Sequence, residues 1–263
     1  MSAARPLLEV RGLNVTFGGV RALGDVSFSV REGELFAVIG PNGAGKTTLF
    51  NCLSAIYRPQ EGSIRLDGQE LVGATPSVLA GLGVSRTFQN LGLSEALDPV
   101  ENILLGRHSR MQAGFLGTAL RLPRMVREEA EHRAVAEEVA AALGLERYAG
   151  QACAVLPYGV RKLVELGRAL AMEPRLLMLD EPVAGMNLEE TEAMAWHIQR
   201  IRNRLGTTVL LVEHDMHFVM DLADRVLVLD FGQVIAVGNP AAVGRDPRVV
   251  EAYLGATAGG EPG

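Results

Sequence analysis

The sequence predicts an α/β fold with a parallel sheet at its core, an antiparallel β element at the N-terminus and an inserted α-helical lobe. Apolar runs at 176–179 and 209–212 lack the alternation of half-exposed strands, which is typical of parallel strands buried on both faces. Residues 7–30 alternate around a Gly18-Gly19 turn instead, which indicates antiparallel strands. Helical spacing dominates the stretch from about 91 to 156.

The elements follow in order from their own residues. Strands are expected at 7–17, 20–30 and 35–39, and a helix from Thr47 to Leu53. Further along the chain we expect a small antiparallel element at 63–71, a short helix opened by Thr75-Pro76, strand 84–88, helix 127–143, helix 159–171, strand 176–180, helix 189–205, strand 207–213, helix 215–223, hairpin 225–238 and helix 247–254. This order predicts one domain over 7–255, with core segments 7–90 and 157–255, a helical lobe at about 91–156 and a flexible tail at 256–263.

Composition narrows the class of protein. With 263 residues and 48% hydrophobic content, the chain can bury one core, or one core plus a lobe. The 25 basic residues against 31 acidic ones, without a basic run, argue against nucleic acid as the main partner. Cys52 and Cys153 lack metal-site spacing. No run of about eighteen apolar residues and no apolar signal segment occurs, so we expect a soluble intracellular chain.

A glycine loop is the most informative stretch. Residues 35–48 read LFAVIGPNGAGKTT, and Gly40, Gly45, Lys46 and Thr47 meet the pattern G-x-x-x-x-G-K-[ST] between a strand and a helix. Unpaired N–H groups at the helix start bind anions, and glycines let the backbone close around phosphates. Lys46 would supply a cation, and Thr47 a hydroxyl for Mg²⁺. A chance glycine turn is the alternative, which the flanking elements disfavour.

The loop therefore predicts a nucleoside triphosphate site on a P-loop NTPase (RecA-like) core. The residues expected to bind the nucleotide are Gly40, Pro41, Asn42, Gly43, Ala44, Gly45, Lys46, Thr47 and Thr48. A second site segment is LLMLDEP at 176–182, where an apolar strand ends in Asp180 and Glu181. Asp180 would hold Mg²⁺, and Glu181 would polarise the attacking water. Two solvated acids at a strand end are the alternative.

The motif order carries a family resemblance. GPNGAGKTT, Gln89, LPYGVRKLVELGRAL, LLMLDEP and VEHD follow one another over residues 7–255, and this order resembles the ATPase subunits of ABC transporters. The resemblance implies that adenine stacks on Phe17, that Gln89 reaches Mg²⁺, and that His214 is a catalytic switch near the γ-phosphate. A core phenylalanine, a surface glutamine and a surface histidine are the ordinary alternatives. It also implies a loop crossing between paired subunits, made by Ala184, Gly185, Met186 and Asn187.

The signature segment departs from the family pattern. The usual L-S-G-G-Q is replaced by L-P-Y-G-V at 156–160, in the segment that reaches the ATP of the other subunit. Pro157 has neither a hydroxyl nor an N–H, whereas the Gly159 and Val160 amides and the helix dipole persist. By resemblance, Tyr158, Gly159 and Val160 act across the dimer. We hypothesise that this composite site is weakened, with the milder alternative that amides and dipole suffice.

One branch of the family is especially similar. The FGG spelling after Thr16, SRTFQN, the insert at 112–131 and the closing AYLG resemble the larger ATPase subunit of branched-chain amino-acid importers. Alternatives are urea or amide import, lipopolysaccharide export, or a regulatory subunit with weak hydrolysis; a soluble P-loop kinase or GTPase lacks the ordered motifs. The insert carries Phe115, Leu116, Leu120, Arg121, Arg124 and Arg127, which either face the membrane partner or form a packed connection.

The resemblance implies the cofactors ATP and Mg²⁺ and a set of partners. These are a second ABC ATPase subunit, expected to be a different chain because of the altered signature, transmembrane permease subunits and, indirectly, a substrate-binding protein. No nucleic acid is expected. The chain would then lie peripherally on the cytoplasmic face of the inner membrane.

Overall fold

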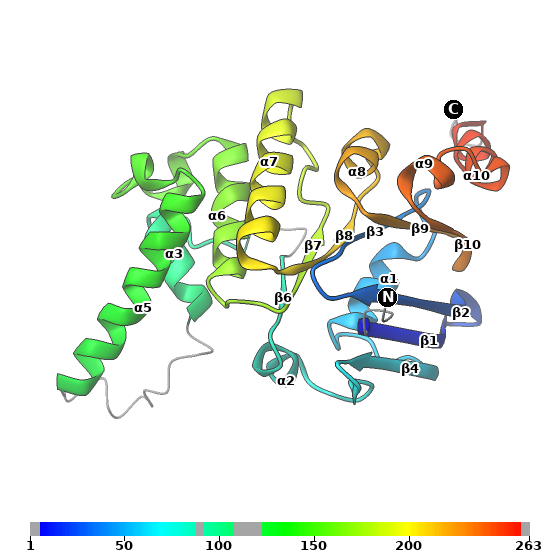
Figure 1. The fold of residues 1–263 in the computed structure, drawn as a ribbon, viewed down its shortest axis with the longest axis horizontal. Helices are drawn as coiled ribbons and strands as arrows, with labels where there is room; N and C mark the ends of the chain where they lie inside the picture. Colours follow the sequence, from blue (N-terminus) through cyan, green and yellow to red (C-terminus); the bar gives the residue numbers. More distant parts are fainter. Residues whose placement is uncertain (1–5, 88–91, 108–122, 259–263) are drawn as a thin grey trace.

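A six-stranded, mostly parallel sheet forms the centre of the computed structural model, which describes residues 6–87, 92–107 and 123–258 (Figure 1). Its strand order is β10-β9-β3-β8-β7-β6, and β10 alone pairs antiparallel within it. The strands are β3 Leu35–Ile39, β6 Val84–Arg86, β7 Leu176–Asp180, β8 Thr208–Val212, β9 Arg225–Asp230 and β10 Gln233–Gly238. Every residue of β3, β7 and β8 is buried, which confirms the prediction of strands covered on both faces.

A second, antiparallel sheet has the order β2-β1-β4-β5. Its strands are β1 Pro6–Phe17, β2 Val20–Arg31, β4 Glu61–Leu66 and β5 Gln69–Glu70. Their alternating burial reflects one face on the core and one face in solvent. The predicted N-terminal β element and the predicted small element after it are therefore parts of one sheet.

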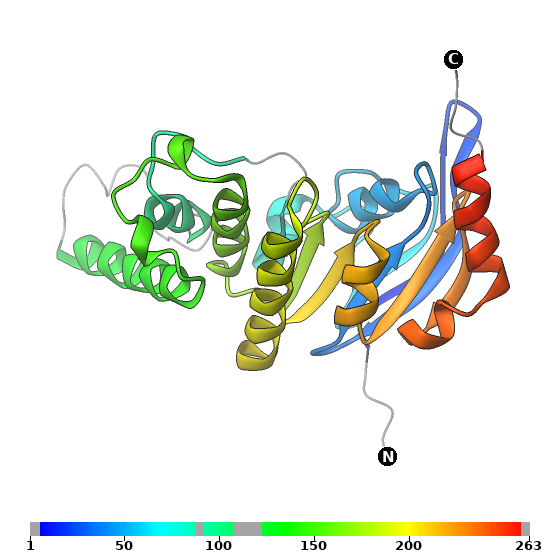
Figure 2. The same ribbon diagram turned by 90° about the horizontal axis from the view of Figure 1, so that it is seen from above.

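Helices cover both faces of the central sheet and form a group at one end. Viewed from above, α3 and α5 lie at one end of the molecule and α10 at the other (Figure 2). The helices are α1 Lys46–Leu53, α2 Pro76–Gly81, α3 Pro99–Gly106, α5 Pro123–Ala142, α6 Tyr158–Leu170, α7 Leu188–Leu205, α8 Met216–Leu222, α9 Pro240–Val243 and α10 Pro247–Ala258, with short 3-10 turns η2 Glu146–Tyr148 and η3 Cys153–Val155.

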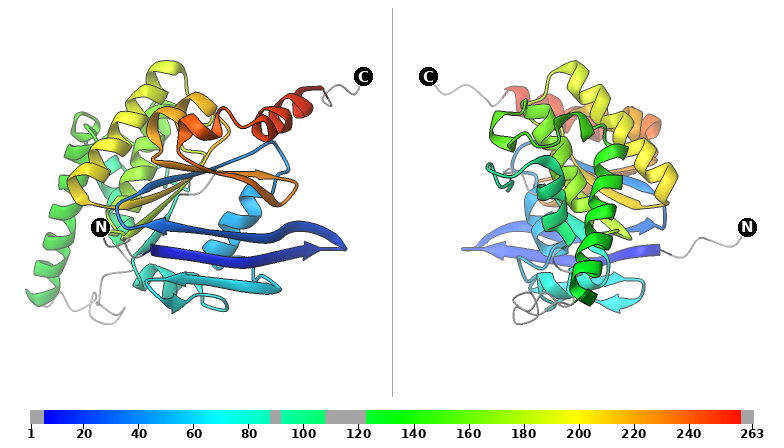
Figure 3. Two further views of the ribbon diagram at one scale, coloured as in Figure 1. Left: turned by 45° about the vertical axis from the view of Figure 1, so that its right-hand side comes forward. Right: turned by 90° about the vertical axis from the view of Figure 1, so that its left-hand side faces the viewer.

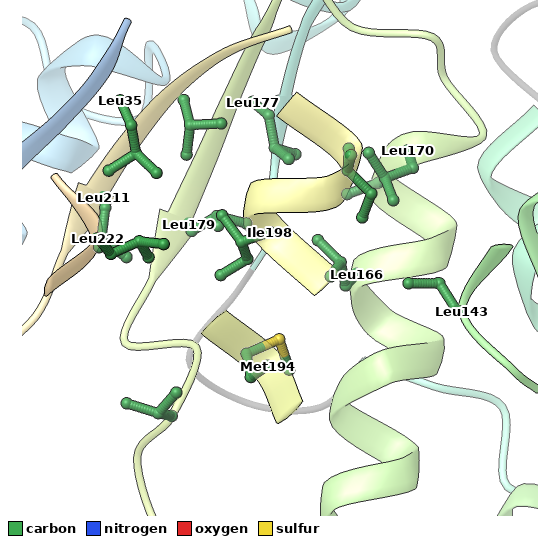
Figure 4. Close-up of a cluster of buried hydrophobic side chains, with 14 of the residues drawn as sticks. Leu35, Leu143, Leu166, Leu170, Leu177, Leu179, Met194, Ile198, Leu211 and Leu222 are labelled. Atoms are coloured by element: carbon green, nitrogen blue, oxygen red, sulfur yellow. The ribbon is translucent and has the colours of Figure 1, made fainter. Parts of the chain in front are cut away.

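Alternate residues of each central strand feed two separate cores. Leu35, Ala37 and Ile39 of β3 join the cluster packed with α6, α7 and α8, part of which is shown in Figure 4. Phe36 and Val38 face the other way, into the cluster with α1 and the antiparallel sheet. Consequently α1 lies between the two sheets (Figure 3). Because successive side chains of a strand point to opposite faces, one set of strand residues packs against α1. This packing holds the helix that follows the glycine loop against the strands that carry the acidic residues.

Some boundaries differ from the sequence predictions. Helix α10 continues to Ala258, beyond the predicted end at 254 and into the expected tail, because the alanines at 256 and 258 favour helix after Gly255. Helices α3 and α9 were not predicted. An Asp98 capping box starts α3, and Asn239 caps α9. In the part of the chain that the structure describes, no helix is both long and apolar enough to cross a membrane.

Candidate functional site

The glycine loop leads from β3 into α1 and is closely packed at Gly40 and Gly45. Gly40 and Gly45 have φ angles of 154° and 100°, a region that side chains other than glycine rarely adopt. A Cβ at Gly40 would lie 2.2 Å from the Leu229 carbonyl oxygen, and one at Gly45 would lie 2.7 Å from that of Ala22. Strands β9 and β2 therefore press on the loop from two sides, and the loop holds its shape only with glycine at these positions.

Lys46 is the first residue of α1 and is held back onto the loop. Its Nζ donates hydrogen bonds to the carbonyl oxygens of Gly40 (2.6 Å) and Pro41 (2.9 Å), and the side chain is buried. Burial lowers the pKa of Lys46, whereas the negative charges of Glu181 and Glu213 act to raise it. The ammonium group is thus a desolvated cation at the base of the loop.

A cavity of about 380 Å³ opens over the loop, which is within the size range of small-molecule sites. It is lined by Val20, Arg21, Ala22, Asn42, Gly43, Ala44, Gly45, Lys46, Thr47, Thr48, Glu181, Phe231 and Gly232. The loop residues from Asn42 to Thr48 were predicted from the sequence, and the wall from β2 and from the β9–β10 turn was missed. Gly40 and Pro41, which were also predicted to bind the nucleotide, do not line the cavity. Their carbonyl oxygens accept the hydrogen bonds from Lys46.

The β9–β10 turn is fastened to the loop by backbone hydrogen bonds. The Gly232 N–H donates to the Ala44 carbonyl (3.0 Å), and the Gly24 N–H donates to the Gly232 carbonyl (2.8 Å). Phe231 has a φ of 42° and is 86% exposed at the edge of the cavity. The D-F-G sequence at 230–232 is that of an ordinary hairpin turn and does not indicate a contact with the glycine loop. The contact could therefore be found only from the structure.

The two acids that end β7 take different positions. Asp180 is buried, and its Oδ2 accepts a hydrogen bond from Arg86 at 2.6 Å. Glu181 lines the cavity, and its backbone N–H donates to the Val212 carbonyl at 2.9 Å. Its φ of 48° lies in the left-handed region, which is uncommon outside glycine and clusters at functional sites. The two neighbouring carboxylates therefore differ in their surroundings: Asp180 pairs with Arg86 in the interior, and Glu181 lines the cavity.

Strand β8 delivers a third acid to the same edge. Glu213 is fully buried and accepts hydrogen bonds from the backbone N–H groups of Val183 (3.1 Å) and His214 (3.0 Å). Burial raises the pKa of Glu213, against these hydrogen bonds, which act to lower it. His214 has an exposed side chain, with its Nδ1 3.5 Å from Glu213 Oε2. Glu213 was not singled out from the sequence, because its hydrogen bond to Val183 joins it to the segment that follows a different strand, β7.

Phe17 is not among the residues that line the cavity. Phe17, at the end of β1, is 47% exposed and packs edge-on against Tyr57 with ring centroids 5.3 Å apart. It is therefore a surface aromatic rather than a core one. Gln89 lies outside the described residues. So do Phe115, Leu116, Leu120 and Arg121 of the insert, and of the Arg124 side chain nothing is described.

The signature segment and the loop after β7 touch each other within the chain. The Tyr158 hydroxyl donates to the Ala184 carbonyl at 3.2 Å, and the Gly185 backbone packs beside the same ring. Met186 packs against the core, and Asn187 is the N-cap of α7, accepting a hydrogen bond from Glu190 N at 3.0 Å. The four residues predicted to cross between subunits therefore follow Glu181 directly and lie next to the signature.

Helix α6 begins at Tyr158, one residue before the predicted start, and Pro157 is its N-cap. Pro157 makes no side-chain capping hydrogen bond. A Cβ at Gly159 would lie 2.5 Å from Glu190 Oε1, so a larger residue at this position would require the Glu190 side chain to move. Val160, in the first turn of α6, is buried in the hydrophobic core. The segment thus offers an uncapped helix N-terminus with amide groups and a dipole.

Comparison with protein families gives two matches. A family described as "ABC transporter" matches residues 23–184, and one described as "Branched-chain amino acid ATP-binding cassette transporter" matches residues 233–259. The first match contains the glycine loop and the acids that end β7. The second covers β10 and the helices that follow it.

Similar proteins extend over nearly the whole chain. The high-affinity branched-chain amino acid transport ATP-binding protein BraF of Pseudomonas aeruginosa is 41% identical over 96% of this chain and 99% of its own length. LivG of Escherichia coli, described in the same words, is 39% identical over the same shares. The crystal structure of the ADP conformation of MJ1267, an ATP-binding cassette of an ABC transporter, has a TM-score of 0.83 at 30% identity and covers 96% of this chain and 100% of that one.

The buried Glu213 predicts a pH-dependent effect of its replacement. Because burial raises its folded pKa above the ordinary 4.5, its contribution to stability is complete below that value and is lost as pH rises through the folded pKa. We therefore expect Glu213→Gln to destabilise the chain less at neutral pH than at mildly acidic pH. Urea unfolding from mildly acidic to neutral pH measures the loss in free energy of unfolding, with the exposed Glu192→Gln as the control. A cost that grows as pH rises would contradict the assignment.

Proposed function

This chain belongs to the ABC transporter family of ATP-binding proteins, and we propose that it is the ATP-hydrolysing subunit of a membrane transporter that takes up branched-chain amino acids. The observation that carries the proposal is the placement of Lys46 and Glu181 in one cavity over the glycine loop. The cargo is supported by the relatives BraF and LivG, whose length this chain matches almost completely. The proposed ATPase domain spans 7–255, with its helical lobe at about 91–156.

The triphosphate would lie on the loop and the first turn of α1. The backbone N–H groups of 43–48 and the helix dipole favour its negative charge. Lys46, which is held by two carbonyl oxygens, would exchange them for phosphate oxygens of the incoming nucleotide. Phe17 is available for adenine stacking because nearly half of its surface is exposed.

The residues present fit a Mg²⁺ ion. Among the described residues, no group of three or more histidines, cysteines or acids surrounds a common point, so no dedicated protein cage exists there. Mg²⁺ is commonly bound by one or two carboxylates together with substrate phosphates and water. Thr47 and Asp180 supply such oxygens from α1 and β7, and Gln89 is a further proposed ligand. A Mg²⁺ ion held by these residues would supply positive charge to neutralise the charge that develops on the phosphates during phosphoryl transfer.

Glu181 and His214 are the proposed catalytic pair. Glu181 reaches the cavity from a left-handed backbone and would orient the attacking water and accept its proton. His214 follows β8 at the same sheet edge, where its side chain is free to approach the γ-phosphate side. Glu213 would hold the histidine backbone in place, because one carboxylate binds both Val183 and His214.

The site would be completed by a partner. The cavity is open to solvent, and the exposed Tyr158 contacts Ala184 and Gly185, so the segments that begin at these residues can face a second ATPase subunit together. We propose that this subunit supplies the signature that covers the ATP on Lys46, that permease subunits anchor the pair at the cytoplasmic face of the membrane, and that a substrate-binding protein delivers cargo.

The Pro157 N-cap favours one alternative role. An uncapped, hydroxyl-free helix start would give the partner's ATP a weaker covering group than serine does. In that case this chain binds and hydrolyses ATP with Lys46 and Glu181, and contributes a regulatory signature to the other site. Both hypotheses assign the same catalytic residues to this chain. They differ in which of the two composite sites hydrolyses ATP.

The catalytic assignment predicts the effect of Glu181→Gln. The amide cannot accept the water proton, so we expect ATP turnover of the assembled transporter to fall roughly 100-fold or more while nucleotide binding persists. Exposed Glu129→Gln on α5 serves as the matched control. If Glu181→Gln and the unaltered complex turn over ATP equally slowly, the proposal that this site hydrolyses ATP is wrong.

The signature assignment predicts a gain from Pro157→Ser. Serine restores a hydroxyl and an N–H at the helix start, and one hydrogen bond to a charged group contributes about 1.5–3 kcal/mol. We therefore expect turnover of the assembled complex to rise roughly tenfold. Pro240→Ser at the start of α9 is the control. Unchanged turnover in Pro157→Ser would show that the amides and dipole of α6 already suffice.

A further inference from the structure

A buried arginine joins the two elements that carry the proposed Mg²⁺ oxygens. Arg86 ends β6, and its Nη2 donates to Asp180 Oδ2 at 2.6 Å. Its Nη1 donates to Asn51 Oδ1 at 2.9 Å and to Ser54 Oγ, both on or directly after α1. The guanidinium also lies over the Phe50 ring, 5.5 Å from its centroid. One planar group thus holds the helix that begins with Lys46-Thr47 against the end of β7.

The pair is shielded from water. The side chains of Arg86 and Asp180 are 8% and 5% exposed, so neither is screened by bulk solvent as a surface pair would be. A carboxylate buried without a countercharge is strongly disfavoured, and it avoids this by taking up a proton or by pairing. Arg86 therefore supplies the countercharge that the buried Asp180 requires, on the same carboxylate group that would offer oxygen to a hard divalent cation.

We propose that Arg86 is a positioning residue that serves as a stand-in cation for Mg²⁺ at Asp180. This inference rests on the proposed metal role of Asp180. While metal is absent, Arg86 neutralises and aims the carboxylate. When metal and nucleotide enter, Arg86 and Mg²⁺ share one carboxylate, and their mutual repulsion weakens metal binding. The arginine thereby raises the Mg²⁺ concentration that the site requires and prevents the empty site from capturing metal before nucleotide arrives.

The charges around the loop support this direction. The negative charges of Glu181 and Glu213 already act on Lys46, raising its pKa against the lowering effect of burial. Asp180 has Arg86 as its close cation, and the Asp180 N–H donates to Thr87 Oγ1 at 3.2 Å, so the end of β6 and the residue after it hold both the side chain and the backbone of Asp180. A purely structural clamp would need the geometry of Arg86 and not its charge. The two roles are separable by their dependence on Mg²⁺.

Magnesium titration of ADP binding tests the proposal without relying on turnover. The full-length chain is held with a fixed concentration of fluorescent mant-ADP, and Mg²⁺ is added from a chelated start. Removal of the competing charge in Arg86→Gln should lower the half-saturating Mg²⁺ concentration about tenfold. Arg65→Gln is the matched control, because Arg65 pairs with exposed Glu70 away from the loop. An unchanged or higher half-saturation in folded Arg86→Gln overturns the proposal.

Thermal unfolding with and without Mg²⁺ gives a second readout. The melting temperature of Arg86→Gln should rise more on addition of Mg²⁺ than that of the unaltered chain, because metal replaces the lost countercharge. A loss of stability that is equal in both buffers identifies a structural clamp and contradicts the proposal. Where Arg86→Gln does not fold, Arg86→Lys keeps the charge and should stay within about twofold of the normal Mg²⁺ dependence. A tenfold shift in Arg86→Lys would contradict a role based on charge.

Asp180→Asn separates this inference from the function on which it rests. If Asp180 holds the metal, its replacement should raise the half-saturating Mg²⁺ concentration at least tenfold. No change in Asp180→Asn means that the metal assignment itself is wrong. A rise in Asp180→Asn without the fall expected in Arg86→Gln means that only the stand-in role of Arg86 is wrong.

Discussion

The parallel register of β3, β8 and β7 is the constraint on which the site depends. These strands run side by side, so their carboxyl ends meet at one edge of the sheet. Pairing places Asp180 opposite Val212, the last residue of β8, and Glu213 follows directly after it. The loop that leaves β3 opens at the same edge. A slip of one residue in any strand would turn its buried side chains to the opposite core and misplace the acids, so the two apolar cores secure the chemistry.

Burial gives this edge its electrostatic character. Lys46, Arg86, Asp180 and Glu213 are all shielded from solvent, a burial that charged groups tolerate only with partners. Each has one here: Lys46 has loop carbonyls, Asp180 has Arg86, and Glu213 has backbone N–H groups. Such preorganised groups need little rearrangement when a highly charged ligand arrives, which suits phosphoryl transfer. The left-handed backbone at Glu181 belongs to the same specialisation.

The sequence sufficed where the signal was local. The glycine loop, the apolar strands before Asp180 and His214, and the antiparallel N-terminal strands were predicted from spacing alone, and the α/β core with its inserted helices was confirmed. Glu213, Arg86 and Phe231 were missed as functional candidates, because their contacts come from strands or turns far away in the chain. Short helix α9 was missed because four residues carry too little periodicity, and the length of α10 depended on alanines beyond Gly255. The roles of the predicted site residues, from Lys46, Asp180, Glu181 and His214 to Phe17, Gln89 and the signature segment, stay predictions.

The central claim is that ATP bound at Lys46 drives uptake of branched-chain amino acids. Uptake of radiolabelled leucine, compared in cells that lack this chain and in cells given back either the unaltered chain or Lys46→Ala, tests it most directly. Loss of the lysine removes the cation from the base of the nucleotide cavity. The account predicts that uptake is lost without the chain, restored by the unaltered chain and not restored by Lys46→Ala. Uptake that is unaffected by the absence of the chain, or fully restored by Lys46→Ala, would contradict it.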